Sequence, residues 1–160
     1  MLRLKAGDWR KLAGLDWGQR RDLAEAWLRV IRASVVLRRR GAKTLERVAG
    51  SVAATGTVGN GDLDRARALA RLVDAAASRS PVRTRCLERS VALSGMLARR
   101  GIPAVLRIGV RRTGADLEAH AWVECAGASL DPEHPESEPF EAFPAGFVEG
   151  SQKKNNRSFF

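Results

Sequence analysis

The chain has 160 residues, 44% of them hydrophobic and 29% charged, and its formal net charge is +10. This length suits one domain with a core of respectable size, and the composition is that of a globular protein, which excludes an intrinsically disordered chain. No apolar run approaches the roughly 18 residues that span a membrane, so an integral membrane protein is excluded as well.

The compartment is predicted from the first residues and from the cysteines. Residues 1–8 contain no apolar stretch after their basic side chains, so we expect no secretory signal. The chain has 2 cysteines, which are better explained as free thiols than as a disulfide framework. Together these features predict a protein of the reducing cytoplasm.

The positive charge is distributed unevenly along the chain. Residues 116–160 carry 3 basic and 9 acidic side chains, so the surplus of positive charge lies in residues 1–115. A basic field favours an acidic partner, which is nucleic acid, an acidic peptide or an acidic protein. A solvated arginine-rich surface explains the charge equally well, so charge alone selects no function.

The first third of the chain is predicted to be helical. Apolar residues recur there at three- and four-residue spacing, as on one face of an amphipathic helix: Leu23, Ala24, Trp27, Leu28, Ile31, Val35 and Val36. Trp17 and Trp27 are expected to anchor a core or an interface rather than to stack on a ligand. Residues 50–61 are rich in Gly, Thr, Ser and Ala, which predicts a loop.

Two further helices are expected in the middle of the chain. Asp62 is predicted to cap a helix with apolar positions over residues 63–73, and Ser80-Pro81 ends it. The next helix is expected from about Thr84 to Arg100, because Gly101 follows where a left-handed cap belongs. We therefore divide the chain into an N-terminal helical lobe (1–60), a second unit (61–150) and a basic tail (151–160).

Strands are predicted after the last helix. Residues 104–111 alternate, with Leu106, Ile108 and Val110 on one face, and a second strand surrounds His120. Gly127 marks a turn, after which a short strand leads into Asp131. Helices followed by an antiparallel meander predict an α+β fold.

Cys86, His120 and Asp131 supply the thiol, imidazole and carboxylate of an activated-cysteine acyl-transfer site. In such a site the imidazole removes the thiol proton, and the carboxylate fixes the tautomer and orientation of the imidazole. This order, on a helix and then on strands, is the order of a papain-like or transglutaminase-like core. The leading hypothesis is therefore a cysteine peptidase or amidase that needs neither a cofactor nor a metal ion.

Cys86 is expected in the first turn of its helix. There the free backbone N–H groups, the helix dipole and Arg83, Arg85 and Arg89 would favour the thiolate. The backbone N–H of Cys86 would also suit an oxyanion donor. The alternative is a buried apolar cysteine with no chemical role.

His120 shares one face of its strand with Trp122 and Glu124. A helix that begins at Cys86 and packs across this face would bring the thiol to the imidazole. His134 is the competing base, but it lies between prolines, where rigid positioning is hard to justify. Glu124 is an alternative to Asp131 as the carboxylate that orients the imidazole.

Cys125 faces away from His120, which predicts core packing. A zinc site made of both cysteines and both histidines lacks the paired short ligand spacings of such sites. A metal site is therefore not expected.

The sequence resembles the transglutaminase-like cysteine peptidases of lasso-peptide biosynthesis over roughly residues 60–135. The resemblance lies in RCLERSVAL (85–93), RRGIPA (99–104), LRIGV (106–110) and AHAWVE (119–124). In that family the helix-opening cysteine is the nucleophile, the histidine of the His-Ala-Trp segment is the base, and a following aspartate orients it. The resemblance therefore assigns these roles to Cys86, His120 and Asp131, on a nucleophile helix and a small antiparallel sheet.

The resemblance implies a leader peptidase that cuts the leader from a ribosomally made precursor, after which a separate ATP-dependent cyclase closes the macrolactam ring. Residues 1–60 contain no strand-rich recognition module, so the chain resembles the standalone protease. Such a protease would need a separate leader-recognition protein. Trp17, Trp27 and Trp122 are candidate contacts for the substrate or for that partner.

Two other functions remain open from the sequence. An acyl transferase of the arylamine acetyltransferase or transglutaminase type would use the same triad and pass the acyl group to an amine. A basic binding module would dispense with Cys86. Nucleic acid is a poor candidate partner, because the chain has no recognition-helix motif and its aromatic residues include 0 tyrosines and 5 phenylalanines for base stacking.

Overall fold

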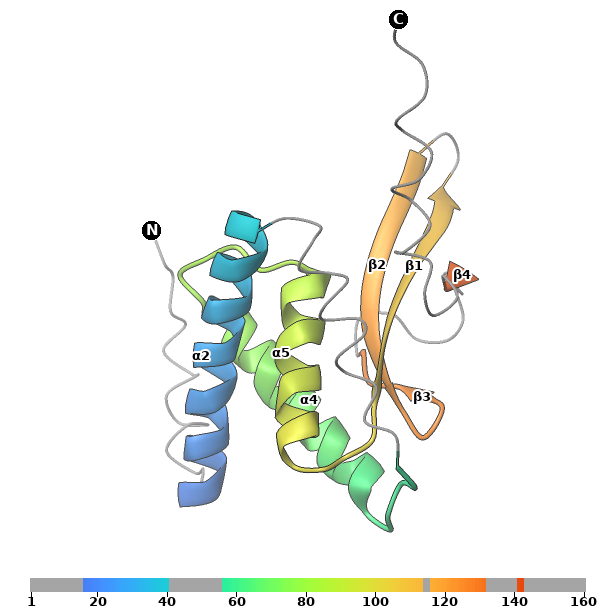
Figure 1. Ribbon diagram of the computed structural model, residues 1–160. Coiled ribbons are helices and arrows are strands. Elements are labelled where there is room, and N and C mark those ends of the chain that lie inside the picture. The colour runs from blue at the N-terminus through green and yellow to red at the C-terminus, as the bar shows by residue number, and fades with distance from the viewer. Residues whose placement is uncertain (1–15, 41–55, 114–115, 132–140, 143–160) are drawn as a thin grey trace, which may run out of the picture.

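The computed structural model describes residues 16–40, 56–113, 116–131 and 141–142. Within them lie helices α2 (Trp17–Arg40), α4 (Asp62–Ser78) and α5 (Cys86–Arg99), and strands β1 (Val105–Thr113), β2 (Asp116–Cys125), β3 (Ala128–Ser129) and β4 (Glu141–Ala142). The helices lie on one side of a small antiparallel sheet, which confirms the predicted α+β fold (Figure 1). None of the helices in these ranges combines the length and apolar character needed to cross a membrane.

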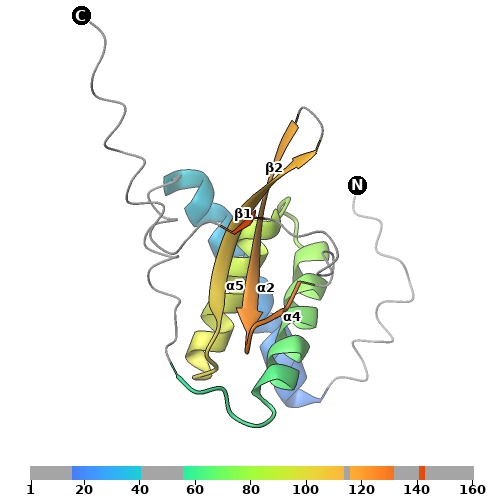
Figure 2. The same ribbon diagram turned by 90° about the vertical axis from the view of Figure 1, so that its right-hand side faces the viewer.

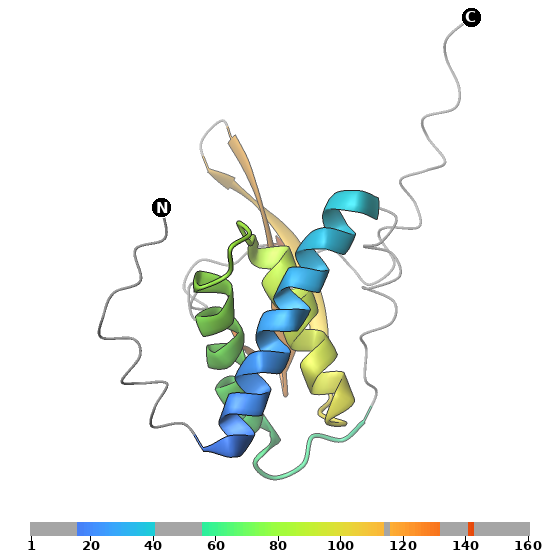
Figure 3. The ribbon, with the colours of Figure 1, turned by 90° about the vertical axis from the view of Figure 1, so that its left-hand side faces the viewer.

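The central element of the fold is α5. Helices α2 and α4 pack on it, and its other side contacts β2 and β1. Figure 3 shows α2 crossing in front of α4 and α5, on the side away from the sheet. Figure 2 shows the opposite side, where β1 and β2 lie in front of the helices. The fold therefore has three layers, with α5 and α4 in the middle.

A single core joins these layers. Its fully buried side chains come from all three helices and from β2, and include Val30, Val73, Met96, Leu97 and Val123. The described part of the predicted N-terminal lobe thus shares its core with the second unit. Most of the rest of residues 1–60 and all of residues 143–160 lie outside the described residues, so the division into units stays a prediction.

The helix ends follow local hydrogen bonding. At the start of α2 the Asp16 carboxylate accepts from the Gln19 backbone N–H at 2.8 Å, and the Gln19 side chain accepts from the Asp16 N–H at 3.2 Å, which is a capping box. The predicted Asp62 cap is wrong. Gly61, with φ 86°, is the N-cap of α4, because the Asp62 carboxylate turns back to accept the Gly59 N–H at 2.8 Å.

The ends of α5 determine where the thiol lies. The helix begins at Cys86, two residues after the predicted start, with Arg85 as an extended N-cap. The Glu88 carboxylate accepts the Arg85 backbone N–H at 2.9 Å and so fixes this start. At the other end Gly101 has φ 66°, and the Ile102 N–H donates to the Leu97 carbonyl at 3.0 Å, which confirms the predicted left-handed cap.

The sheet has the order β3-β2-β1-β4, and the long strands β1 and β2 pair antiparallel. The register places Leu106 opposite Val123 and Gly109 opposite His120. Between β2 and β3 the chain turns at Ala126 and Gly127, with φ values of 54° and 77°. Positive φ at both positions is the geometry of a two-residue hairpin, and it confirms the predicted turn at Gly127.

An ion-pair network fastens α2 to the end of α5. Arg100 Nη2 donates to Asp22 Oδ1 at 2.5 Å and to Glu25 Oε2 at 3.0 Å, and Arg29 Nε donates to Glu25 Oε1 at 2.7 Å. Burial by itself would raise the pKa of Glu25, but the hydrogen bonds and charges of Arg29 and Arg100 outweigh it and lower the pKa below its ordinary value of 4.5.

Glu25→Gln should therefore lower the free energy of unfolding at pH 7 by about 1 kcal/mol. A carboxyl whose pKa is lower in the folded state stabilises the protein fully above its unfolded pKa and progressively less as the pH falls through the folded value. The difference between wild type and variant should thus shrink below about pH 4.5. Urea unfolding at several pH values measures it, with the highly exposed Asp64→Asn as the control that should change little.

Candidate active site

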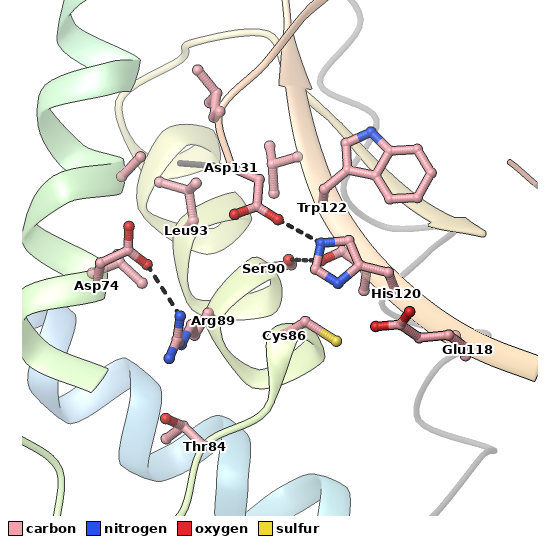
Figure 4. Close-up of a pocket in the computed structure, with 16 residues that line it drawn as sticks. Asp74, Thr84, Cys86, Arg89, Ser90, Leu93, Glu118, His120, Trp122 and Asp131 are labelled. Atoms are coloured by element: carbon pink, nitrogen blue, oxygen red, sulfur yellow. Dashed lines mark hydrogen bonds and ion pairs between the residues drawn. The ribbon is translucent and has the colours of Figure 1, made fainter. Parts of the chain in front are cut away.

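A cavity of about 290 Å³ lies between α4, α5 and β2 and contains all three residues of the predicted triad. Cys86 comes from the start of α5, His120 from β2, and Asp131 from the residues that follow β3 (Figure 4). The tertiary structure thus brings together side chains that are separated by 45 positions of sequence. We take this cavity as the candidate active site.

Cys86 is the first residue of α5 and is half-buried. Figure 4 shows its thiol extending toward the ring of His120. The first backbone hydrogen bond at this end of the helix runs from the Arg89 N–H to the Arg85 carbonyl, so the Cys86 N–H has no partner within the helix. An N–H in this position can bind an oxyanion that forms at the thiol.

The three nearby arginines differ in their surroundings. Arg89 forms an ion pair with Asp74 of α4, with 3.8 Å between Nη1 and Oδ1, so its charge is partly compensated. Arg83 and Arg85 are exposed at the segment that leads into α5. Positive potential beside the thiol therefore comes from the helix terminus and from these two arginines.

The imidazole of His120 is only 8% exposed, and it is held by Asp131. His120 Nε2 lies 2.5 Å from Asp131 Oδ2. A carboxylate at Nε2 favours the proton on that nitrogen, which leaves the lone pair of Nδ1 available to take the thiol proton. Asp131 reaches this position because the hairpin pairs Leu130 with Val123, through a hydrogen bond of 2.8 Å from the Leu130 N–H.

The helices do not cover the face of β2 that carries His120. They cover the opposite face, where Val123 and Cys125 belong to the core. Among the described residues, β2 pairs on this edge only with the two residues of β3, and residues from both of its faces line the cavity beside His120. Thiol and imidazole therefore line one cavity at the edge of the strand rather than across its face.

Trp122 stacks on His120, with ring centroids 6.1 Å apart and ring planes 9° from parallel. Its indole N–H donates to Glu124 Oε1 at 3.0 Å, and Arg107 Nε donates to Glu124 Oε2 at 3.0 Å. Glu124, the alternative partner of the imidazole, is thus engaged by Trp122 and Arg107. The chain of contacts holds the indole against the ring of His120 and so restricts that ring.

Sequence reasoning missed Ser90. Its buried hydroxyl donates to the Ala121 carbonyl at 2.8 Å and fastens α5 to β2 next to His120. The available signal was its spacing, since Ser90 lies four residues after Cys86 and therefore on the same face of the helix. A polar residue there can contact whatever the thiol faces.

Other predicted positions lie elsewhere. Trp17 and Trp27 are on α2, do not line the cavity and are 86% and 40% exposed, so they are not core anchors. Trp122 does line the cavity. His134 lies outside the described residues. Within the described ranges no three His, Cys, Asp or Glu side chains are placed to hold a metal ion.

Cys125 is 1% exposed and packs in the core, as predicted. Burial, together with the charge of Asp62, raises the pKa of its thiol. A buried thiol with a raised pKa is a poor nucleophile. The two cysteines thus occupy opposite environments, and only Cys86 reaches a cavity with a base.

Comparison with known proteins supports the same fold. The profile of the transglutaminase-like superfamily matches residues 27–143, which is well over half of the chain. No significant match was found among the curated proteins or among the solved structures. The matched range includes all three triad positions and every described helix and strand except the beginning of α2.

Alkylation by iodoacetamide should separate the two thiols. At pH 7, Cys86 should react on the order of a hundredfold faster than Cys125, which becomes reactive only on unfolding. His120→Ala should slow Cys86 about tenfold, because the thiol loses its base. Peptide mass spectrometry after timed quenching gives both rates.

His134→Ala is the matched control, since it removes the other histidine of the chain. It should leave the rate at Cys86 unchanged. Equal effects of the two histidine variants, or a Cys86 that is as inert as Cys125, would contradict the dyad.

Proposed function

This chain belongs to the transglutaminase-like superfamily, and we propose that it is a cysteine peptidase that removes the leader from a ribosomally synthesised lasso-peptide precursor. The observation that carries the proposal is the bond from His120 to Asp131 in the same cavity as Cys86. That arrangement supplies a nucleophile, a base and an orienting carboxylate. The resemblance of the motifs around them to the lasso-peptide leader peptidases supplies the substrate class.

In the first half of the proposed reaction, His120 Nδ1 takes the proton of the Cys86 thiol and the sulfur attacks the carbonyl carbon of the scissile peptide bond. The negative charge that develops on the carbonyl oxygen is stabilised by the Cys86 N–H and the terminus of α5. The imidazolium then gives its proton to the leaving amine. The C–N bond breaks, and a thioester joins Cys86 to the leader.

In the second half, His120 removes a proton from a water molecule, whose oxygen attacks the thioester carbonyl. The C–S bond breaks, the leader leaves with a free carboxylate, and His120 returns the proton to the sulfur. Asp131 keeps the imidazole in one orientation through both halves, and its negative charge stabilises the imidazolium. The freed amine at the start of the core peptide is the group that a macrolactam cyclase would consume.

The outer side of α2 supports a role for a separate leader-recognition protein. Trp17, Leu28 and Val35 are exposed and fall on one stripe of the helix, since they are separated by eleven and seven residues. Trp27 is also exposed, about 100° around the helix from Leu28. Exposed apolar side chains that alternate with arginines such as Arg32 on one helix suit docking of a protein surface.

The proposal is tested by incubating the protein with a precursor peptide and its leader-recognition protein, and following the products by mass spectrometry. Wild type should release the leader with a free carboxylate. Cys86→Ala should lose at least about a thousandfold in rate, and Asp131→Asn about a hundredfold.

Cys125→Ala removes the other thiol and should retain activity. An intact precursor with wild type, or equal rates for Cys86→Ala and wild type, would reject the peptidase. A leader that leaves joined to an added amine rather than as the acid would identify an acyl transferase instead.

Trp17→Ala and Trp27→Ala should weaken the effect of the leader-recognition protein while leaving the folded enzyme intact. We expect the concentration of that protein needed for half-maximal processing to rise about tenfold. Alkylation of Cys86 reports on the site itself and should not change. Full processing at wild-type concentrations by both variants would show that the exposed tryptophans of α2 do not bind the partner.

A further inference from the structure

A second cavity, of about 640 Å³, opens where the end of α2 meets the segment that leads into α5. We call it the basic groove and define it by Leu37, Arg38, Arg83, Thr84, Arg85 and Leu87. Thr84 also lines the cavity that holds Cys86 and His120, so the two cavities adjoin. Figure 4 shows Thr84 on the segment that runs into α5 at Cys86. A polypeptide with its scissile bond at Cys86 therefore reaches the groove within a few residues.

The groove gathers positive charge from two parts of the chain. Arg38 comes from the last turns of α2, whereas Arg83 and Arg85 precede α5, and all three are exposed. Arg38 Nη2 donates to the Arg83 backbone carbonyl at 2.8 Å, which holds its guanidinium at the groove. Among the described residues, no carboxylate forms an ion pair with any of these three guanidinium groups.

Within the part of the chain that the structure describes, Glu88 is the one carboxylate that lines the groove, and it is already engaged. It is buried, and its Oε2 accepts the backbone N–H of Arg85 in the cap of α5. Some arginines elsewhere in the fold are paired, as Arg100 is with Asp22 and Glu25. These three guanidinium groups have no counter-ion in the described ranges; like charges repel one another, and an anion bound among them removes that repulsion.

We propose that the basic groove binds an acidic side chain of the substrate polypeptide, within a few residues of the scissile bond. This inference rests on the proposed function. Guanidinium groups bind carboxylates through paired, charge-assisted hydrogen bonds, which fix the position of the bound chain. Leu37 and Leu87 add apolar surface against which its aliphatic part packs. The described residues of the groove lining include no aromatic side chain on which a base stacks, which disfavours nucleic acid.

Binding is measured with full-length Cys86→Ala protein, so that no cleavage occurs. The probes are two fluorescein-labelled hexapeptides that differ only in carrying two glutamates or two glutamines, followed by fluorescence anisotropy. The glutamate peptide should bind about tenfold more tightly. Arg83→Gln combined with Arg85→Gln should remove this preference, and Arg38→Gln should weaken it without altering the start of α5.

Arg32→Gln is the matched control. It removes the same charge from an exposed position of α2 outside the groove and should leave the preference intact. Equal binding of the two peptides would overturn the proposal. So would an equal loss of the glutamate preference in Arg32→Gln, because binding would then depend on the overall positive charge of the protein rather than on the groove. So would displacement of the glutamate peptide by oligo-dT at lower concentrations than by unlabelled glutamate peptide.

A digest of precursor peptides randomised on both sides of the scissile bond, by the active enzyme together with the leader-recognition protein, separates this inference from the proposed function. Enrichment of aspartate and glutamate beside the cleaved bonds, lost in Arg83→Gln with Arg85→Gln, supports both. Cleavage without that enrichment overturns the role of the groove and leaves the peptidase. No cleavage, together with charge-dependent binding, rejects the peptidase and retains an acidic-peptide site.

Discussion

The seating of α5 against β2 sets the geometry on which the site depends. Met96 and Leu97 of α5 share the core with Val123 of β2, and Ser90 hydrogen-bonds the Ala121 carbonyl. Because this packing fixes both the depth and the rotation of the helix, it also fixes where its first residue, Cys86, lies. A helix that slid along the strand by one turn would move about 5.4 Å and carry the thiol away from the imidazole.

Short-range polar contacts orient the site side chains that the packing of the core brings together. Asp131 holds the imidazole at Nε2, Trp122 stacks on the ring, and Glu124, itself bound by Arg107, holds the indole. Such contacts add little to global stability, but they limit rotation of a group whose orientation determines proton transfer. In the transglutaminase-like fold of this chain, apolar packing thus brings the site residues together, and a few hydrogen bonds orient their side chains.

The charged side chains on the helical side of the fold differ in whether they form ion pairs. Where Asp22, Glu25 and Asp74 are available, arginines pair with them and join α2, α4 and α5. The groove beside Cys86 leaves three guanidinium groups without such partners in the described residues. The arginines behind the net charge of +10 thus include some that join helices through ion pairs and three that line the groove next to the Cys86 thiol.

Sequence periodicity and turn chemistry by themselves determined the order of the elements from α2 to β3, the cap at Gly101 and the turn at Gly127, because these are properties of neighbouring residues. They also indicated that Cys125 is buried. The sequence also offered the three residue types of the triad. Only the tertiary structure decided that α5 covers the face of β2 opposite His120, so that thiol and imidazole line one cavity at the strand edge. The same holds for Ser90 bonding to Ala121, for Glu124 serving Trp122, and for Arg38 joining Arg83. Each of these contacts depends on how whole helices and strands are oriented, or on which of several polar partners a side chain selects. The local sequence encodes neither the orientation nor the selection.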